Sequence, residues 1–515
     1  MGRQGQAGGA LPCAAVRSLL TRSELTIDEN RVLRAVCLMS GLAVVVSASY
    51  NFVLPPMLTG LGATPAQGSM LRTIPSIGSL LVIFPAGILG IRLGPRRLLG
   101  LAGVSVAVGS LLVAAAPAVF VATVGMLLLS VGRSALFVIV IAMLTTATTR
   151  DGARPVAFSA YAMVSPIIYV GIPLLSGLLL SVAPWRSVAV LWAVSGLGIV
   201  AVAVLLVRDG SERDSLPGEL WTPALAGLTL TCVVRLLQGL YDDGGMSVGV
   251  VVWGASAVLA LVVLAVLLRR LPEPSLSLHP LRGGGLVLLL LVVVLIPFSN
   301  MWYYATLGLE YVYGKSVLVT AALLAIPQVA SVFAASGAKR LMKAKGVTMA
   351  GTLLLLATSA TLFLSCIQSV RLPLVVALLV LCLYSAAVTA AGVPLSVSIV
   401  SLADEGEEGS IASLRGAAGS LGGALGVIFM SFVVSVGIGS SSPDADDLVK
   451  GIRNGELTHD PAPRFDVPQG DLEVLDDRGM QAMVNGYRAH GLAGGIVTLG
   501  AAGVFFSNRR NHPKV

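Results

Sequence analysis

Charged residues are scarce in this chain, and their scarcity excludes a soluble globular protein. Asp, Glu, Lys and Arg make up 12% of the 515 residues, against about 25% in an average soluble domain. Hydrophobic residues make up 56%, and apolar stretches of about 20 residues, long enough to cross a bilayer, recur throughout. The composition therefore predicts an all-α polytopic membrane protein.

Cysteine is rare, and the motifs of catalysis are missing from the sequence. The five cysteines show neither a pairing pattern nor the spacing of metal ligands, so we expect no disulfide and no metal site. The chain has no glycine loop of the nucleotide-binding type and no nucleophile triad. We therefore expect that the protein is not an enzyme and uses no cofactor.

The basic residues follow the apolar runs and do not form a patch. The net charge is +8, but Lys and Arg are scattered over short connections, so we expect no nucleic-acid partner. Residues 1–32 carry arginines without the apolar core of a signal peptide. We expect this segment to stay on the protein as a cytoplasmic tail.

Fourteen apolar runs are long enough to span a membrane. They lie at about 33–55, 69–90, 98–117, 119–143, 159–183, 187–207, 221–241, 247–268, 286–309, 317–338, 347–368, 373–399, 411–438 and 482–506. An even number places both termini on one side, and Lys and Arg concentrate in the segments that share that side. The other short segments hold only Arg186, Lys315 and Arg371. Because cytoplasmic loops are rich in Lys and Arg, the sequence predicts a multi-pass plasma-membrane protein with both termini cytoplasmic.

Two further segments stand out. Residues 440–479 form one long polar segment with a net charge of −6, from ten acids and four bases. We expect it to be external, as a lid, as an amphipathic hairpin around Leu448 and Ile452, or as a solvated loop. In the thirteenth run, Gly419 with Gly423 and Gly422 with Gly426 stand four residues apart. Such small faces allow close helix packing, and they also allow helices to slide.

A basic link joins the second and third runs and resembles a family motif. Residues 87–97 read Gly-Ile-Leu-Gly-Ile-Arg-Leu-Gly-Pro-Arg-Arg, and glycine permits a tight reversal there. The pattern resembles the loop between the second and third helices of the major facilitator superfamily, through Gly87, Leu89, Arg92, Gly94 and Arg96. Ile91 replaces the family's acid and Pro95 replaces an arginine, so the resemblance implies an inner gate latched more weakly or in another way. The alternative is a generic basic loop.

Further motifs follow in the family's order. Residues 171–177 resemble the antiporter signature of the fifth helix, through Gly171, Pro173 and Gly177. Arg133, residues 185–186, residues 309–314 and residues 410–416 match other positions of the fourteen-helix drug:proton antiporters of the QacA and EmrB kind. The resemblance implies a major facilitator fold of two six-helix bundles with two inserted helices and alternating access.

The resemblance also implies a division of the chain. A cytoplasmic tail at 1–32 is followed by an N-terminal six-helix bundle at 33–207. Two linker helices with their flanking loops occupy 208–284. A C-terminal six-helix bundle at 285–506 follows, with its external loop at 440–479. Residues 507–515 form a second cytoplasmic tail.

Ionisable residues inside the expected spans are few. A charge at the bilayer centre costs about 2.5 to 3.5 kcal/mol, so each one needs a reason. Arg133 lies deepest, whereas Arg72 and Arg235 lie nearer the outer ends, where snorkelling to the interface is the alternative to a site. The candidate substrate cavity combines Arg133 with amide and aromatic groups. Its residues are Tyr50, Asn51, Arg133, Asn300 and Tyr303, and an interfacial aromatic belt is the alternative for Trp302 and Tyr304.

Proton coupling lacks its usual residue. The family's first helix carries an aspartate nine residues before its closing proline, and counting back from Pro55 reaches Val46. Arginine cannot replace that aspartate, because its guanidinium keeps its proton. Among carboxylates near the membrane, Glu310 is the coupling candidate, and an ordinary interfacial glutamate is the alternative.

Three functional hypotheses follow. The first is a proton-coupled exporter of hydrophobic or amphiphilic small molecules, with the substrate, the lipid bilayer and protons as partners. The second is an uncoupled facilitator, or a lipid- or anion-translocating carrier of the same fold. The third is a sensor that binds a ligand without transporting it.

Overall fold

The computed structural model describes residues 26–63, 65–148, 153–208, 219–242, 245–271, 284–315, 317–402, 408–439 and 469–508. All regular secondary structure in these ranges is helical, and thirteen helices there are long and apolar enough to cross a membrane. The prediction of an all-α polytopic membrane fold is confirmed. In chain order the helices are α2 (Ile27–Gly60), α3 (Pro65–Leu93), α4 (Pro95–Ala114), α5 (Val119–Ala147), α6 (Ala153–Val182), α7 (Arg186–Leu206), α8 (Trp221–Asp242), α9 (Val248–Arg270), α10 (Gly285–Leu295), η2 (Ile296–Ser299), α11 (Trp302–Leu307), η3 (Gly308–Val312), α12 (Val317–Lys345), α13 (Val347–Leu364), η4 (Ser365–Ile367), α14 (Leu374–Val400), α15 (Glu408–Gly439) and α17 (Gln469–Ser507).

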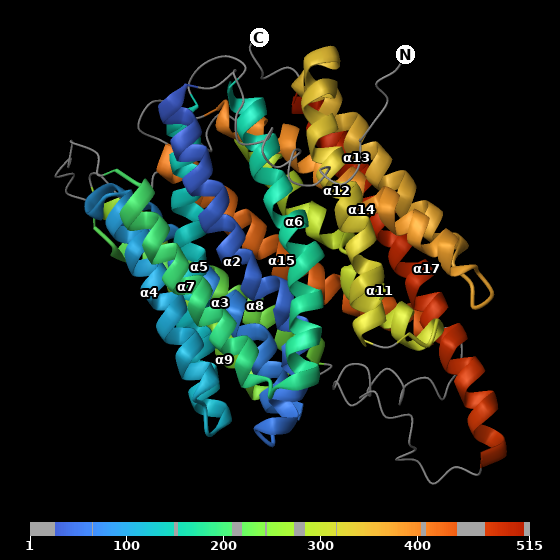
Figure 1. Cartoon of the computed structure of the whole chain (residues 1–515). Helices are drawn as coiled ribbons and strands as arrows, with labels where there is room; N and C mark the ends of the chain where they lie inside the picture. Colours follow the sequence, from blue (N-terminus) through green and yellow to red (C-terminus); the bar gives the residue numbers. More distant parts are fainter. Residues whose placement is uncertain are drawn as a thin grey trace, which may run out of the picture.

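The long helices run roughly side by side and alternate in direction. Helix α2 begins and α17 ends at one end of the bundle, which we call the termini face (Figure 1). Helix α15 ends and α17 begins at the opposite end, which we call the loop face. These two faces are the reference for the positions described below.

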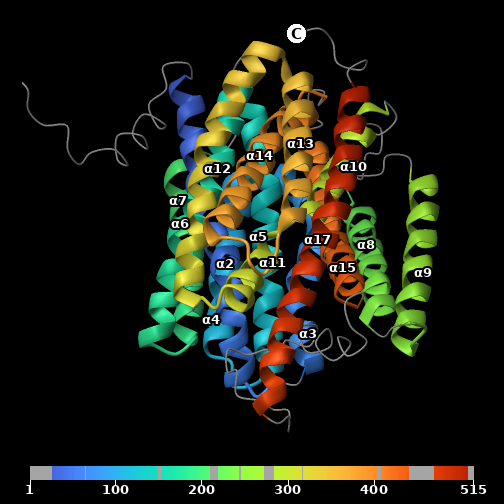
Figure 2. The same ribbon diagram turned by 90° about the vertical axis from the view of Figure 1, so that its right-hand side faces the viewer.

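The helices form two groups. Helices α2 to α7 pack against one another as the first group, and α10 to α17 pack as the second. The groups meet where α6 contacts α12 and α14, and where α15 contacts α3 and α5. Helix α8 packs against both α3 and α15, whereas α9 packs on α8 at the edge of the molecule (Figure 2). The domain boundaries expected from the sequence stay a prediction.

The ninth apolar run, predicted at 286–309, is interrupted and does not form one continuous helix. Helix α10 passes into the 3₁₀ turn η2, and α11 and the π-helical η3 follow. Pro297 has no N–H to continue an α-helix. The Asn300 side chain accepts a hydrogen bond from the Trp302 N–H at 3.1 Å, which starts the next helix. The Tyr384 hydroxyl donates to the Ser299 carbonyl at 2.7 Å, so that backbone oxygen is satisfied inside the bundle.

Glycines of α15 let the interrupted helix approach closely. A Cβ added at Gly422 would lie 2.5 Å from the Val294 carbonyl oxygen, and one at Gly426 would lie 2.7 Å from the Pro297 oxygen. A Cβ at Gly423 would meet nothing within 4 Å. Of the two glycine pairs seen in the sequence, the pair Gly422 and Gly426 therefore makes the close contact.

Helices α2 and α17 are among those that begin earlier than the apolar runs predict. Helix α2 begins at Ile27, because Thr26 and Glu29 form a capping box in which each side chain bonds the other's backbone N–H. Helix α17 begins at Gln469, so residues 469–479 of the expected loop are helical. Pro468 precedes this start, and Asp471 and Glu473 suit the positive end of a helix dipole. Residues 440–468 lie outside the described ranges.

The glycine packing predicts opposite effects at neighbouring positions. Gly422→Ala should lower the apparent thermal stability, because overpacking a tight contact costs about 1–3 kcal/mol. Gly423→Ala is the matched control and should be nearly neutral, since its methyl group has open space. Thermal unfolding of the purified protein in lipid nanodiscs, followed by tryptophan fluorescence, compares the two. Equal losses in both variants would contradict the packing.

Candidate functional site

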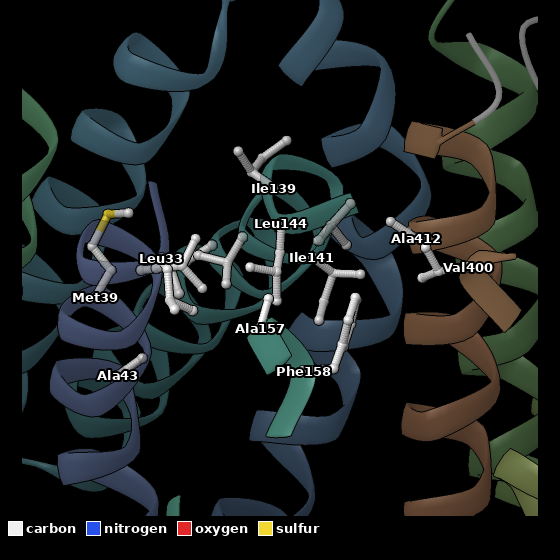
Figure 3. Close-up of a cluster of buried hydrophobic side chains, with 14 of the residues drawn as sticks. Leu33, Met39, Ala43, Ile139, Ile141, Leu144, Ala157, Phe158, Val400 and Ala412 are labelled. Carbon is white, nitrogen blue, oxygen red and sulfur yellow. The ribbon is translucent and has the colours of Figure 1, made fainter. Parts of the chain in front are cut away.

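A buried apolar cluster joins the two groups at the termini face, and we call it the seal. The first group contributes side chains from α2 to α7, and the second contributes side chains from α12 to α15. Figure 3 shows Ile141 and Phe158 from the first group and Val400 and Ala412 from the second. Most members are Ala, Val, Leu or Ile. The contact between the groups at this face is therefore mainly van der Waals packing.

Arg415 lies in the seal, two turns into α15. Its guanidinium donates to the Ser396 hydroxyl at 2.8 Å and lies 6.0 Å from the centre of the Phe137 ring. It also interacts electrostatically with Tyr161 of α6. Arg415 thus links α15 and α14 of the second group to α5 and α6 of the first. The sequence analysis included Arg415 only within the family-matching segment 410–416, because its contact partners lie far away along the chain.

Two smaller contacts close the same seam. The Ser336 hydroxyl of α12 lies 3.0 Å from the Met163 sulfur of α6. A Cβ at Gly416 would lie 2.8 Å from the Ile83 side chain, so α15 packs closely on α3. Such small side chains interlock little.

The loop face is built differently. The apolar cluster of the first group there includes Val53, Met57 and Trp192. The cluster of the second group includes Met301 and Tyr384 and is separate from it. Among the described residues, no buried cluster joins the groups at this face, although α6 and α12 stay close where Gly177 faces Leu318. Among the described residues, a buried apolar cluster therefore joins the two groups at the termini face, and none joins them at the loop face.

Arg133 lies deep within the first group, as the sequence predicts. Its neighbours enclose it, and it interacts electrostatically with Tyr169 of α6. Both residues are only partly buried although they lie inside the bundle, so each borders space between the helices. Among the described residues, no carboxylate forms a salt bridge with Arg133 or Arg415. These two cations are the charged groups of the candidate site.

The other predicted cavity residues are placed as follows. The Tyr50 hydroxyl donates to the Leu71 carbonyl at 2.8 Å, and the ring lies 6.4 Å from that of Trp192. Tyr50 therefore helps to hold α2 against α3 and α7. Asn300 is exposed and caps α11. The side chains of Asn51, Tyr303 and Glu310 lie outside what the structure describes, although their backbones are helical.

Val46 is packed into the apolar cluster of the first group with 1% of its surface exposed. Its neighbours in that cluster include Val106, Met126 and Trp192. The position where the resembling family carries an acid is therefore hydrophobic in its surroundings as well as in its own side chain.

The described residues contain no group of three or more His, Cys, Asp or Glu that could hold a metal ion.

In the structure, most of the basic segment 87–97 belongs to α3 and α4, and only Gly94 lies between the two helices. Gly94 has φ +78°, follows the last residue of α3 and directly precedes Pro95, the first residue of α4. Arg96 donates to the Val204 carbonyl at 3.1 Å and ties this turn to the end of α7. Arg92 is half-buried. Ile91, at the family's acid position, is exposed.

The remaining motif positions lie on α3 and on α6. Gly87 is buried, and Leu89 packs against the seal. On α6, Pro173 is buried inside a continuous helix. A Cβ at Gly171 would meet nothing within 4 Å, and one at Gly177 would lie 3.3 Å from Leu318.

The second group repeats the turn, which the sequence analysis missed. Gly346 has φ +79° and ψ 162° between α12 and α13, against φ 78° and ψ 154° at Gly94. Lys343 and Lys345 lie in the last turn of α12, as Arg92 lies in the last turn of α3. In the sequence, this second turn is marked only by one glycine after the basic end of an apolar run, without the other residues of the motif at 87–97. Both turns lie at the termini face, next to the seal.

The match to known proteins agrees with this architecture. A model of the Major Facilitator Superfamily matches residues 36–427, so the chain belongs to this family. Its members are transporters that carry small molecules across membranes. The chain is accordingly a multi-pass membrane protein with the fold of a secondary transporter. No curated protein sequence matches it.

Solved structures support the fold. The human organic anion transporter MFSD10 (TETRAN) is similar over 91% of this chain and 99% of its own, with a TM-score of 0.59 and 16% identity. The E. coli fucose:proton symporter FucP is similar over 94% of this chain and 98% of its own, with a TM-score of 0.52 and 14% identity. A structure of FucP in the outward conformation is similar over 82% of this chain and 96% of its own, with a TM-score of 0.51 and 15% identity. At such identities the likeness shows the fold alone, and the drug:proton antiporter branch stays a proposal.

The glycine turn predicts an effect on the rate of transport. Gly94→Ala forces a side chain into a region of positive φ and extended ψ that is essentially restricted to glycine, which costs about 1–3 kcal/mol. We expect slower turnover for every transported compound and nearly unchanged binding, because the turn lies away from Arg133. Transport and binding of a panel of fluorescent amphiphiles measure both. Gly100→Ala in α4 is the control, since its Cβ would meet nothing within 4 Å; a selective change in which compounds bind would contradict the prediction.

Proposed function

We propose that this chain is a secondary active transporter that exports hydrophobic or amphiphilic small molecules by alternating access, coupled to protons. One observation carries the proposal: a buried cluster joins the two helix groups at the termini face, and separate clusters occupy the loop face. Alternating access requires a protein that can be sealed at one face at a time. This conformation supplies one of the two states.

The seal suits a contact that must break in every cycle. It consists mainly of small apolar side chains, and its partly buried Arg415 has the Ser396 hydroxyl, the Phe137 ring and Tyr161 as partners. We assign the gating role to the two glycine turns and to the edge between α6 and α12. On that edge, a Cβ at Gly177 of α6 would lie 3.3 Å from Leu318 of α12, and Pro173 stands about one turn earlier in the same helix.

The substrate class follows from Arg133. A partly buried cation that borders internal space favours a ligand carrying negative charge, and the neighbouring helices supply apolar and aromatic surface. We therefore propose amphiphilic compounds with an anionic group as the best substrates. The structural likeness to a protein described as an organic anion transporter agrees with this choice.

We propose that the termini face is cytoplasmic and the loop face external, in the plasma membrane. The bias of Lys and Arg toward the termini face supports this orientation. The sealed termini face then makes the present conformation the outward-facing one. Residues between α15 and α17 would lie outside the cell.

Cysteine labelling tests the orientation. In a variant with the native cysteines replaced by serine, Ser442→Cys should react with an impermeant maleimide on intact cells. Arg97→Cys, in the exposed first turn of α4, should react only after the cells are opened. The reverse pattern would overturn the orientation without touching the fold.

An uncoupled carrier of anions or lipids is the second candidate. The specific observation in its favour is the apolar surroundings of Val46, where the resembling family carries its acid. A coupled carrier must therefore hold its proton elsewhere. Glu310 remains the proposed carboxylate for that role.

Transport into proteoliposomes decides between these functions. We expect uptake of an anionic amphiphilic dye that an imposed pH gradient accelerates. Glu310→Gln should abolish the acceleration and keep exchange without a gradient, because an amide cannot take up the proton. Unchanged acceleration in that variant would eliminate Glu310. If the pH gradient does not change the rate of dye uptake by the native chain, the uncoupled carrier is favoured. If the native chain binds the dye without taking it up, a sensor is favoured.

A further inference from the structure

Arg133 and Arg415 lie near the same side of α5. Phe137 follows Arg133 in α5 by one helical turn, about 6 Å along the axis. The guanidinium carbon of Arg415, from α15, lies 6.0 Å from the centre of the Phe137 ring. Residues four positions apart share a face of a helix, so Arg415 lies over the side of α5 that carries Arg133. Arg415 is the one closer to the termini face, because α5 runs toward that face and places Leu144 in the seal.

Helix α6 shows the same order of the two arginines. Tyr169 interacts electrostatically with Arg133, and Tyr161 interacts electrostatically with Arg415. The two tyrosines stand eight residues apart in α6, which places them on one side of the helix and about 12 Å apart along its axis. Tyr161 packs against the seal, whereas Ile168, beside Tyr169, packs against the loop-face cluster of the first group. Each arginine therefore lies beside its own tyrosine of α6, with Arg133 deeper in the bundle.

The contacts of Arg415 in this conformation are with uncharged groups. Its Nη2 donates to the Ser396 hydroxyl at 2.8 Å, and its guanidinium faces the Phe137 ring and Tyr161. Among the described residues, its Nη1 is buried without a hydrogen-bond partner. A guanidinium presents its N–H donors in a planar fork that matches the oxygens of a carboxylate, sulfonate or phosphate. Part of this capacity to bind an anion is therefore unused while the seal is closed.

Opening of the seal would free this cation. Phe137 and Tyr161 belong to the first group and Arg415 belongs to the second, so separation of the groups removes both aromatic partners. A charge inside the membrane that loses its partners needs water or a counter-charge. The open seal admits both from the termini face. An anionic group that enters from that face meets Arg415 before it meets Arg133.

We propose that Arg415 is a second binding site for the anionic group of the substrate, used while the seal is open, and that this group passes to Arg133 as the seal closes. On closure, Phe137 and Tyr161 take the place of the substrate at Arg415, which is the arrangement seen here. Both sites take an oxyanion carried on an apolar body. The inference rests on the proposed transport function and adds the order in which the substrate meets the two arginines.

A thiol beside Arg415 tests the site without any transport. In the full chain, with its native cysteines replaced by serine, Ser396→Cys places a thiol where the native hydroxyl lies 2.8 Å from the arginine. The protein is studied in lipid nanodiscs, and the labelling rates of a sulfonate-bearing and a trimethylammonium-bearing methanethiosulfonate reagent are compared. The preference for the sulfonate should fall at least about ten-fold when Arg415→Gln is added, because a neighbouring positive charge is lost. Arg415→Lys keeps the charge and should keep the preference.

Protection of the same thiol identifies the ligand. Anilinonaphthalene sulfonate is an anionic amphiphile, and N-phenylnaphthylamine has the same rings without the sulfonate. The anionic probe should slow labelling of Ser396→Cys by a neutral reagent more than the uncharged probe does. Arg415→Gln should remove this difference, and Arg133→Gln should keep it. Equal protection by the two probes, a difference that survives Arg415→Gln, or a thiol that never reacts would overturn the proposal.

The start of α15 supplies a control. Glu408 stands two turns before Arg415, and its side chain lies outside what the structure describes. Glu408→Gln removes a negative charge, so the preference for the sulfonate reagent and the protection by the anionic probe should both remain. Loss of either in this variant would show that Arg415 alone does not make the site and would overturn the proposal.

Transport measured from each side tests the order of the two sites. The readout is the half-saturating concentration of the anionic probe divided by that of the uncharged probe. Arg415→Gln should raise this ratio about ten-fold or more for entry from the termini face, the effect of one hydrogen bond to a charged group, and should not raise it for entry from the loop face. Arg133→Gln should raise it from both sides. An arginine that only holds the seal would change both probes alike, and an unchanged ratio would overturn the proposal.

The two measurements separate this inference from the proposed function. If the native chain carries neither probe but the protection by the anionic probe depends on Arg415, the proposed function fails and the site stands. If the native chain carries both probes and Arg415→Gln changes neither the ratio nor the protection, this inference fails and the function stands.

Discussion

The structure depends on a rule of the bilayer: backbone polar groups need partners within the protein, because lipid offers none. A continuous helix satisfies the rule alone, but the ninth apolar run does not stay continuous past Pro297. One of the carbonyls at this interruption, that of Ser299, accepts a hydrogen bond from the Tyr384 hydroxyl of α14. Glycines of α15 and α17 let those two helices approach the interruption closely. Neighbouring helices are therefore fitted to one interruption, and any motion of that interruption must move them or break this bond.

The seal between the two helix groups is held together by a different kind of interaction. Helices gain little from the hydrophobic effect inside lipid, so small side chains and close packing hold them together. Across the seam these contacts are short-ranged, and Arg415 adds a polar contact without a carboxylate partner among the described residues. An ion pair buried there would resist separation strongly, since breaking it leaves an uncompensated charge. A cation that binds a hydroxyl and faces aromatic rings can exchange partners at lower cost, which suits a gate that opens repeatedly.

The two helix groups contain the same kind of glycine turn at the termini face. Gly94 and Gly346 adopt nearly the same backbone conformation, and each joins two long helices with a single residue. Such a link leaves little freedom between its helices, so each pair is expected to move as a unit. The basic residues that precede both glycines lie beside the seal. The turns connect the geometry of each half to the contact that has to form and break.

The sequence by itself determined the class of protein, because long apolar runs can be satisfied only as membrane helices. It also identified Gly94, whose positive φ demands glycine, and Arg133, because a charge within an apolar run is costly and therefore conspicuous. Only the tertiary structure decided which contacts these residues make. The break after α10, the pairing of Gly422 with Val294, and the meeting of Arg415 with Tyr161 depend on residues far apart in the chain.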